Sequence, residues 1–159
     1  MSALTLSQAQ TIVATALAHA REKGFQPLAV LVLDARGVPK AFAAEDGTSL
    51  RRYEIAHGKA HGALAMGIGS RTLGKRAEER PHFIAAVTHV VGGALVPVPG
   101  GVLIRAADRA IIGAVGISGD NSDNDEAAAI AGIAALSAHC AIELNGDLIN
   151  AGVSRRMSI

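Results

Sequence analysis

The amino-acid sequence predicts an α+β domain in which helices cover an antiparallel β-sheet. Two short apolar runs rich in β-branched residues each pass through a turn into a second run, over 27–45 and 102–118. Such hairpins pair antiparallel strands, and segments with apolar residues at helical spacing surround them. The 159 residues, half of them hydrophobic, suffice for one core. We therefore expect a single domain over 1–159, with its core at about 4–140 and a tail of undefined structure at 141–159.

The elements follow from local signals. The first helix is expected to begin at Thr5 or Ser7, because either hydroxyl can cap it together with a glutamine three residues on, and to end at Gly24. A strand at 27–34 should pass through a turn at 35–37 into a strand at 38–45. A loop at 46–49 should then lead into a helix at 50–66. Next we expect a loop with several glycines at 67–80 and a short helix that begins with proline at 81–91. A strand at 102–106, a turn at 107–109, a strand at 110–118 and a last helix at 124–140 should follow.

Composition excludes several classes of function. The net charge is +1 and no basic patch interleaved with aromatic residues is present, so we expect no nucleic-acid partner. No apolar run approaches eighteen residues, so we expect no membrane partner. Cys140 is the only cysteine and therefore forms no internal disulfide. The first twenty residues lack the basic start of a signal peptide. Together these features predict a cytoplasmic protein.

Four carboxylates lie within seven residues, at the start of the last predicted helix: Asp120, Asp123, Asp125 and Glu126. A helix start carries unpaired backbone N–H groups and a partial positive charge, so acidic residues stabilise it. Capping by Asp123, Asn124 or Asp125 accounts for one or two of the four. We expect the others to contact a neighbouring subunit, through a residue such as Arg71 or Arg76.

Two histidines, His57 and His61, lie four residues apart on the helix predicted over 50–66, so both side chains can reach one metal ion. The alternative is a pair of partly exposed helix histidines without a ligand. His19 lies at the edge of the apolar stripe of the first helix. Taken alone, a histidine there is more often a satisfied, half-buried residue than a ligand.

Three stretches together resemble one known family. They are "LAVLVLDARG" at 28–37, "AEDGTSLRRYEIAHGKA" at 44–60 and "PGGVLIRAADRAIIGAVGISGDNSDNDEAAAIAG" at 99–132. Their order and content are similar to the GlcG/HbpS family of haem-binding and haem-degrading proteins, which is related to the C-terminal domain of PduO-type corrinoid adenosyltransferases. The resemblance covers about residues 4–138. It implies a profilin-like layered domain with a five-stranded antiparallel sheet, assembled with copies of itself into a dimer or larger oligomer, up to an octamer.

The resemblance also implies a cofactor, haem, and a role in haem or iron handling or in organic-acid utilisation. In some members a histidine late in the first helix binds the haem iron, and His19 occupies a comparable place. Second choices as ligands and candidate partners for the haem propionates or ring are His57, His61, Lys59, Arg51, Arg52 and Tyr53, with Phe25 and Phe42 as further flat walls. We expect the imidazoles of the first and middle helices to flank one cavity beside the sheet.

An alternative function is an enzyme or sensor for a small organic acid. His57 or His61 would then be the acid–base group, and Lys59 or Arg71 would hold the carboxylate. The Gly100–Gly101 turn would offer backbone N–H groups to the anion. The residues define no complete catalytic constellation, so enzymatic activity is left open. A third reading is an oligomeric accessory protein with a mainly structural role.

Overall fold

The computed structural model describes residues 3–136, 140–144 and 147–150, and its centre is one antiparallel sheet. The strands are β1 (Ala29–Asp34), β2 (Pro39–Ala44), β3 (Gly101–Ala106), β4 (Ile111–Ser118), β5 (Cys140–Leu144) and β6 (Asp147–Asn150). They pair in the order β2-β1-β4-β3-β5-β6, and every neighbouring pair is antiparallel. The expected α+β class and both expected hairpins, β1–β2 and β3–β4, are therefore confirmed.

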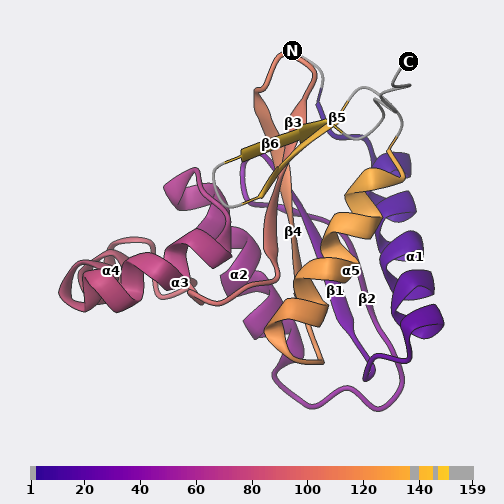
Figure 1. Ribbon diagram of the computed structural model, residues 1–159, viewed down its shortest axis with the longest axis horizontal. Helices are drawn as coiled ribbons and strands as arrows, with labels where there is room; N and C mark the ends of the chain where they lie inside the picture. Colours follow the sequence, from indigo (N-terminus) through magenta and orange to yellow (C-terminus); the bar gives the residue numbers. More distant parts are fainter. Residues whose placement is uncertain (1–2, 137–139, 145–146, 151–159) are drawn as a thin grey trace, which may run out of the picture.

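Helices cover both faces of the four strands β2-β1-β4-β3 (Figure 1). Helices α1 (Leu6–Lys23) and α5 (Ser122–Ala134) pack together on one face, and α2 (Arg52–Met66) packs on the other. All six residues of β1 are buried, because this strand lies between the two helical layers. A strand covered on both faces reads as a continuous apolar run, and this is the pattern of 28–33.

Glycine permits the close approach of α2 to the sheet. A Cβ atom added at Gly116 of β4 would lie 2.0 Å from the carbonyl oxygen of Ala56 and 2.9 Å from Cβ of Ala60. No larger residue fits this contact without moving the helix. The buried face of α2 is correspondingly small, with Ala56, Ala60 and Ala63 against Leu31 and other core residues of the sheet.

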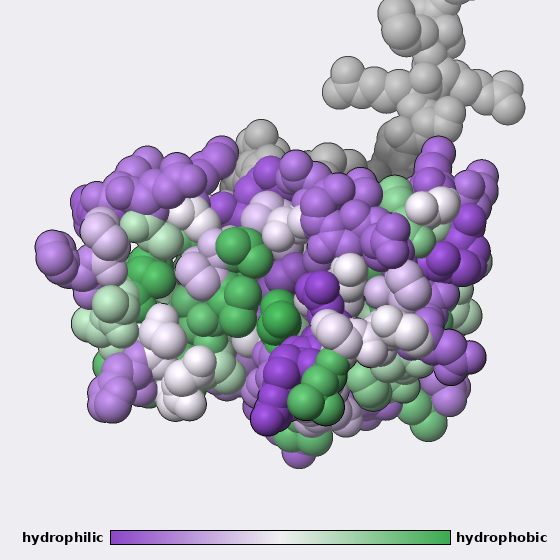
Figure 2. All heavy atoms as spheres, turned by 90° about the horizontal axis from the view of Figure 1, so that it is seen from below, coloured by the Kyte–Doolittle hydropathy of each residue, from purple (hydrophilic) through white to green (hydrophobic). Residues whose placement is uncertain are grey.

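Helices α3 (Ser70–Glu79) and α4 (Pro81–Val90) form an arm beside α2, shown at the left of Figure 1. Leu73, Ile84 and Leu95 form a small core of their own there. Phe83 and Val90 remain exposed, and apolar surface gathers at the same side in Figure 2. Within the described residues, no helix has both the length and the apolar character needed to cross a membrane.

Three expectations about the elements are wrong. The segment 67–80, predicted as a loop, contains α3, and Gly74 does not interrupt this helix. Glycine at position 74 instead permits a close contact, because an added Cβ atom would lie 2.9 Å from the carbonyl oxygen of Pro97. The last helix begins at Ser122 and ends at Ala134, earlier than the expected 124–140. The sheet is not five-stranded: β5 and β6 extend it beyond β3, in a segment where the sequence shows no period.

The β1–β2 turn is held by Asp34. Its Oδ1 accepts hydrogen bonds from the backbone N–H groups of Arg36 and Val38 at 2.8 and 3.1 Å, and its Oδ2 accepts from the Arg36 guanidinium at 2.8 Å. The guanidinium of Arg36 and these backbone donors lower the pKa of the Asp34 carboxyl below its usual value. The ionised carboxylate therefore contributes to the stability of the turn.

The Asp34→Asn variant is expected to lose about 1–2 kcal/mol of unfolding free energy at pH 7, because charge-assisted hydrogen bonds are replaced by weaker ones. A carboxyl whose pKa is lower in the folded than in the unfolded protein stabilises the fold above its unfolded pKa, and this contribution is lost as the pH falls toward the folded pKa. The difference in unfolding free energy between the variant and the wild type should thus become smaller below about pH 4. Urea unfolding at pH 7 and pH 3 measures it. The exposed Asp46→Asn substitution is the control, and a deficit that is the same at both pH values would refute this role of the ionised carboxylate.

Candidate functional site

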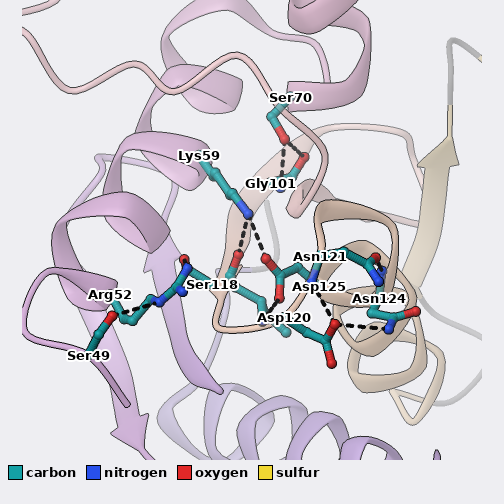
Figure 3. Close-up of polar contacts among 11 residues, drawn as sticks. Ser49, Arg52, Lys59, Ser70, Gly101, Ser118, Asp120, Asn121, Asn124 and Asp125 are labelled. Carbon is teal, nitrogen blue, oxygen red and sulfur yellow. Dashed lines mark hydrogen bonds and ion pairs between the residues drawn. The ribbon is translucent and has the colours of Figure 1, made fainter. Parts of the chain in front are cut away.

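A buried ion pair joins α2 to α5 through the centre of the molecule. The side chain of Lys59 is 2% exposed and that of Asp125 is 1% exposed. Lys59 Nζ lies 2.8 Å from Asp125 Oδ2 and donates a second hydrogen bond, of 2.9 Å, to the carbonyl oxygen of Ile117 at the end of β4 (Figure 3). The ammonium of Lys59 is therefore enclosed by protein groups and is not exposed to the haem propionate or the substrate carboxylate that we expected it to bind.

Burial affects the two partners in opposite directions. It lowers the pKa of the Lys59 ammonium, and it raises the pKa of the Asp125 carboxyl. In each case the attraction between the two groups opposes the effect of burial. The other oxygen of the carboxylate, Asp125 Oδ1, accepts from the backbone N–H of Asp120 at 3.0 Å. The pair thus fixes the start of α5 to α2 and to the end of β4.

The Gly100–Gly101 turn is filled by protein groups. Gly101 N–H donates to Ser70 Oγ at 2.7 Å, and the Gly100 carbonyl oxygen accepts from Ile117 N–H at 2.9 Å. A Cβ atom at Gly101 would lie 2.3 Å from the carbonyl oxygen of Lys59. The expected offer of backbone N–H groups to an anion is thus wrong: the glycines serve close packing against α2.

The start of α5 is capped by Asn121, whose side-chain oxygen accepts from the backbone N–H of Asn124 at 2.9 Å. Asp120 instead ties this turn to the segment after α1: its Oδ2 accepts from Gln26 N–H at 2.7 Å. That hydrogen bond is the main reason why the pKa of Asp120 is lowered. The sequence predicted that Asp123, Asn124 or Asp125 caps this helix. That prediction is wrong, because the cap is Asn121.

The remaining carboxylates of the cluster meet Arg71, which lies near the start of α3. Its guanidinium Nε donates to Glu126 Oε2 at 2.7 Å, and its Nη2 also pairs with Asp123. These contacts raise the pKa of Arg71. The sequence identified Arg71 as a partner, but it placed the contact between subunits. The contact is within one chain, so the carboxylates need no neighbouring subunit and Arg71 is not free to hold a substrate.

A row of stacked rings runs along the outer side of α2. Phe42 of β2 meets Tyr53 edge to face, with ring centroids 5.0 Å apart. Tyr53 stacks on His57 at 6.0 Å, and His57 stacks on His61 at 5.3 Å. Residues four apart on a helix lie on the same face, which accounts for the row. We call these four residues the aromatic–imidazole row.

Two features distinguish the histidines of this row. Burial lowers the pKa of His57, and the neighbouring His61 lowers it further. The ring nitrogen Nδ1 of His61 lies 2.9 Å from the carbonyl oxygen of Ala94. Arg51 lies nearby at the start of α2, but its guanidinium pairs at 2.6 Å with Glu54. The row is thus a partly exposed surface on which His57 has a lowered pKa and His61 is anchored to a backbone carbonyl.

His19 lies apart from this row. It is half-buried on α1, with its ring edge-on to Phe25 at 5.9 Å. Helix α1 covers the face of the sheet opposite to α2, so the expectation of one imidazole wall beside a single cavity is wrong for one chain. Four surface pockets, of about 330 to 530 Å³, are lined by described residues, and none of these four includes a histidine. Sequence periodicity placed each histidine on its helix but did not reveal which side of the sheet the helix covers.

The chain is thus an α+β domain in which an antiparallel sheet lies between two helical layers. The buried ion pair of Lys59 and Asp125 links the helices α2 and α5. The family model described as "Haem degrading protein HbpS-like" matches residues 4–134, and the chain belongs to this family. No curated protein matches the chain.

Several solved structures share the fold. The first, "Crystal Structure of PduOC:Heme Complex", has 26% identity and a TM-score of 0.76, and the match covers 85% of this chain and 96% of that one. HbpS has 28% identity and a TM-score of 0.73, with 86% and 92% covered. The Klebsiella pneumoniae protein ORFY, at 21% identity, shares the fold alone, with a TM-score of 0.74 and 84% and 90% covered.

Proposed function

We propose that this chain binds haem, with His19 as an axial ligand of the iron. The support from relatives is its membership of the HbpS-like family and its similarity to the PduOC–haem complex over most of both chains. Within the chain itself, the proposal rests on the hydrogen bonding of His19. Neither ring nitrogen of His19 has a hydrogen-bond partner among the described residues, whereas His61 has one.

The surroundings of His19 fit a single bond to haem iron. A neutral imidazole is a common axial ligand. The aromatic ring of Phe25 beside it restricts the imidazole and offers apolar surface for a flat macrocycle. When bound, haem would supply a redox-active iron, and the protein groups that we assign act only by binding and orienting it. Lys59 has no part in this site, because its ammonium is enclosed in the ion pair with Asp125.

We further infer that a second copy of the chain covers the bound haem. His19 is half-buried at the surface of α1 and lines none of the four pockets. A haem there would expose one face of the macrocycle, and burial of that face against a partner would favour assembly. This agrees with the homo-oligomer that the sequence resemblance implies.

A small organic acid is the weaker candidate ligand. Each of the groups expected to hold its carboxylate already has partners within the chain: Lys59, Arg71 and the Gly100–Gly101 turn. The groups expected to assist His57 or His61 in binding an acid are therefore engaged with other parts of the chain. We therefore assign these histidines a different role below.

Titration with hemin, followed by absorption spectroscopy and by size-exclusion chromatography, tests the proposal. Wild-type protein is expected to give a sharp Soret band and to elute with the haem as an oligomer. The His19→Ala variant should bind hemin about tenfold or more weakly, since no other histidine among the described residues lies on that face of the sheet. The matched control is His82→Ala, an exposed histidine on α4 that should behave as wild type. Equal affinity in wild type and His19→Ala would overturn the assignment of His19.

A further inference from the structure

His57 and His61 form a pair whose geometry suits a metal ion rather than a haem. They are four residues apart on α2, and their rings are stacked with centroids 5.3 Å apart and planes inclined by 27°. Two histidines at this helical spacing can direct a nitrogen each to one ion, as in helical zinc sites. The two imidazoles lie side by side on one helix face, so they cannot bind opposite sides of one haem. They can fill two adjacent positions around a small cation.

The anchoring of His61 determines which of its nitrogens is free. A carbonyl oxygen only accepts hydrogen bonds, so the Nδ1 atom that lies 2.9 Å from the oxygen of Ala94 carries the hydrogen. The lone pair of the neutral ring is then on Nε2. A metal-binding histidine typically has its other nitrogen held by a carbonyl or carboxylate in this way, because the bond fixes the tautomer and the ring direction.

The carbonyl that anchors His61 is itself held by the fold. The segment that carries Ala94 lies across α2, where the backbone N–H of Val96 donates to the oxygen of Gly58 at 3.0 Å. A Cβ atom at Gly58 would lie 2.6 Å from the Val96 side chain, and one at Gly62 would lie 3.0 Å from Leu95. Glycines thus let this segment contact the helix on the turns that carry the two histidines. The direction of the His61 ring is built into the packing.

The ring of His57 is held by stacking against the rings of its neighbours on α2. It lies between Tyr53 and His61 in the aromatic–imidazole row, and its ring nitrogens have no hydrogen-bond partner among the described residues. The stacking restricts the ring before any ion binds, which reduces the entropy lost on binding. No group of three or more potential metal ligands occurs in the described part of the chain. Water would therefore complete the coordination of an ion held by these two side chains.

We infer that His57 and His61 chelate one divalent transition-metal ion per chain, at a site separate from the haem site. Imidazole suits copper, nickel and zinc, and a site with two nitrogen ligands and no rigid cage should follow the general order of affinities, with Cu²⁺ bound more tightly than Ni²⁺, and Ni²⁺ more tightly than Co²⁺. Magnesium and calcium prefer oxygen ligands and should not compete.

Calorimetric titration of the haem-free protein with NiCl₂, and electron paramagnetic resonance with CuCl₂, test the inference. The wild type is expected to bind one Ni²⁺ per chain, and the Cu²⁺ spectrum should show coupling to two equivalent imidazole nitrogens. His57→Gln and His61→Gln, which keep a polar side chain in place, should each weaken Ni²⁺ binding by about tenfold or more. Each variant should also reduce the copper coupling to one nitrogen.

Two controls separate this site from others. His82→Gln and His89→Gln alter exposed histidines of α4 and should leave the affinity for Ni²⁺ unchanged. The double variant His57→Gln/His61→Gln should still bind hemin as the wild type does, so a failure of the haem proposal and a failure of the metal site are distinguishable. Wild-type Ni²⁺ affinity in both single variants would overturn the inference, and so would a copper spectrum with only one coupled nitrogen in the wild type.

Discussion

Replacement of Lys59 by methionine is expected to lower the free energy of unfolding by about 3–5 kcal/mol, because it leaves the Asp125 carboxylate buried without its partner. Asp125 is 1% exposed, and Lys59 provides its only cationic contact within hydrogen-bond distance among the described residues. The methionine side chain has a similar length, so the loss reports the missing charge more than a missing volume. Urea unfolding followed by circular dichroism measures the change.

The double variant Lys59→Met/Asp125→Asn should recover part of this loss. It removes the uncompensated charge, and the asparagine oxygen can still accept from the backbone N–H of Asp120, as Asp125 Oδ1 does. The surface control is Arg51→Met, which breaks the exposed pair with Glu54 and should leave stability unchanged within error. A Lys59→Met variant as stable as Arg51→Met would show that the buried pair does not hold α5 to the sheet.

The Gly116→Ala substitution is expected to cost about 3 kcal/mol or more, through overpacking between β4 and α2. The new methyl carbon would be placed 2.0 Å from the backbone oxygen of Ala56, and backbone cannot rotate away as a flexible side chain can. Helix α2 would have to shift as a whole, together with Lys59. Thermal and urea unfolding of the variant measure the cost.

The matched control for this substitution is Gly69→Ala. There the nearest atom to the added Cβ, the oxygen of Gly101, lies at 3.5 Å, which is an ordinary contact. Gly69 is also at an N-cap, where alanine is unfavourable by about 1 kcal/mol or less relative to glycine. If Gly116→Ala were no more destabilising than Gly69→Ala, the close contact between α2 and the sheet would not be a constraint on the fold.

Local signals in the sequence were sufficient where the structure depends on neighbours in the chain. The Thr5–Gln8 capping box and the left-handed Gly24 cap of α1 are present as expected. The two hairpins also follow from apolar runs that flank short turns. Each of these features is decided within about ten residues, so periodicity and turn chemistry describe it well.

The candidate site was less accessible from the sequence, because its contacts join distant segments. Lys59 and Asp125 are 66 residues apart, and nothing local marks either as buried. One signal was present: Lys59 has Gly58 and Ala60 as neighbours on a helix whose other buried positions are all alanine or glycine. A lysine on such a face has to be enclosed with a partner. The opposite placement of His19 and His57 likewise depends on which face of the sheet each helix covers.

Rescue by free imidazole tests the central proposal, that His19 binds haem iron, most directly. In a His19→Gly variant mixed with hemin, the account predicts that the wild-type Soret band and the coelution of haem with protein are lost. Addition of imidazole should restore both, because the small ligand occupies the space that the side chain has left. A His19→Gly variant that shows the wild-type spectrum and retains haem on the column without imidazole would contradict the account.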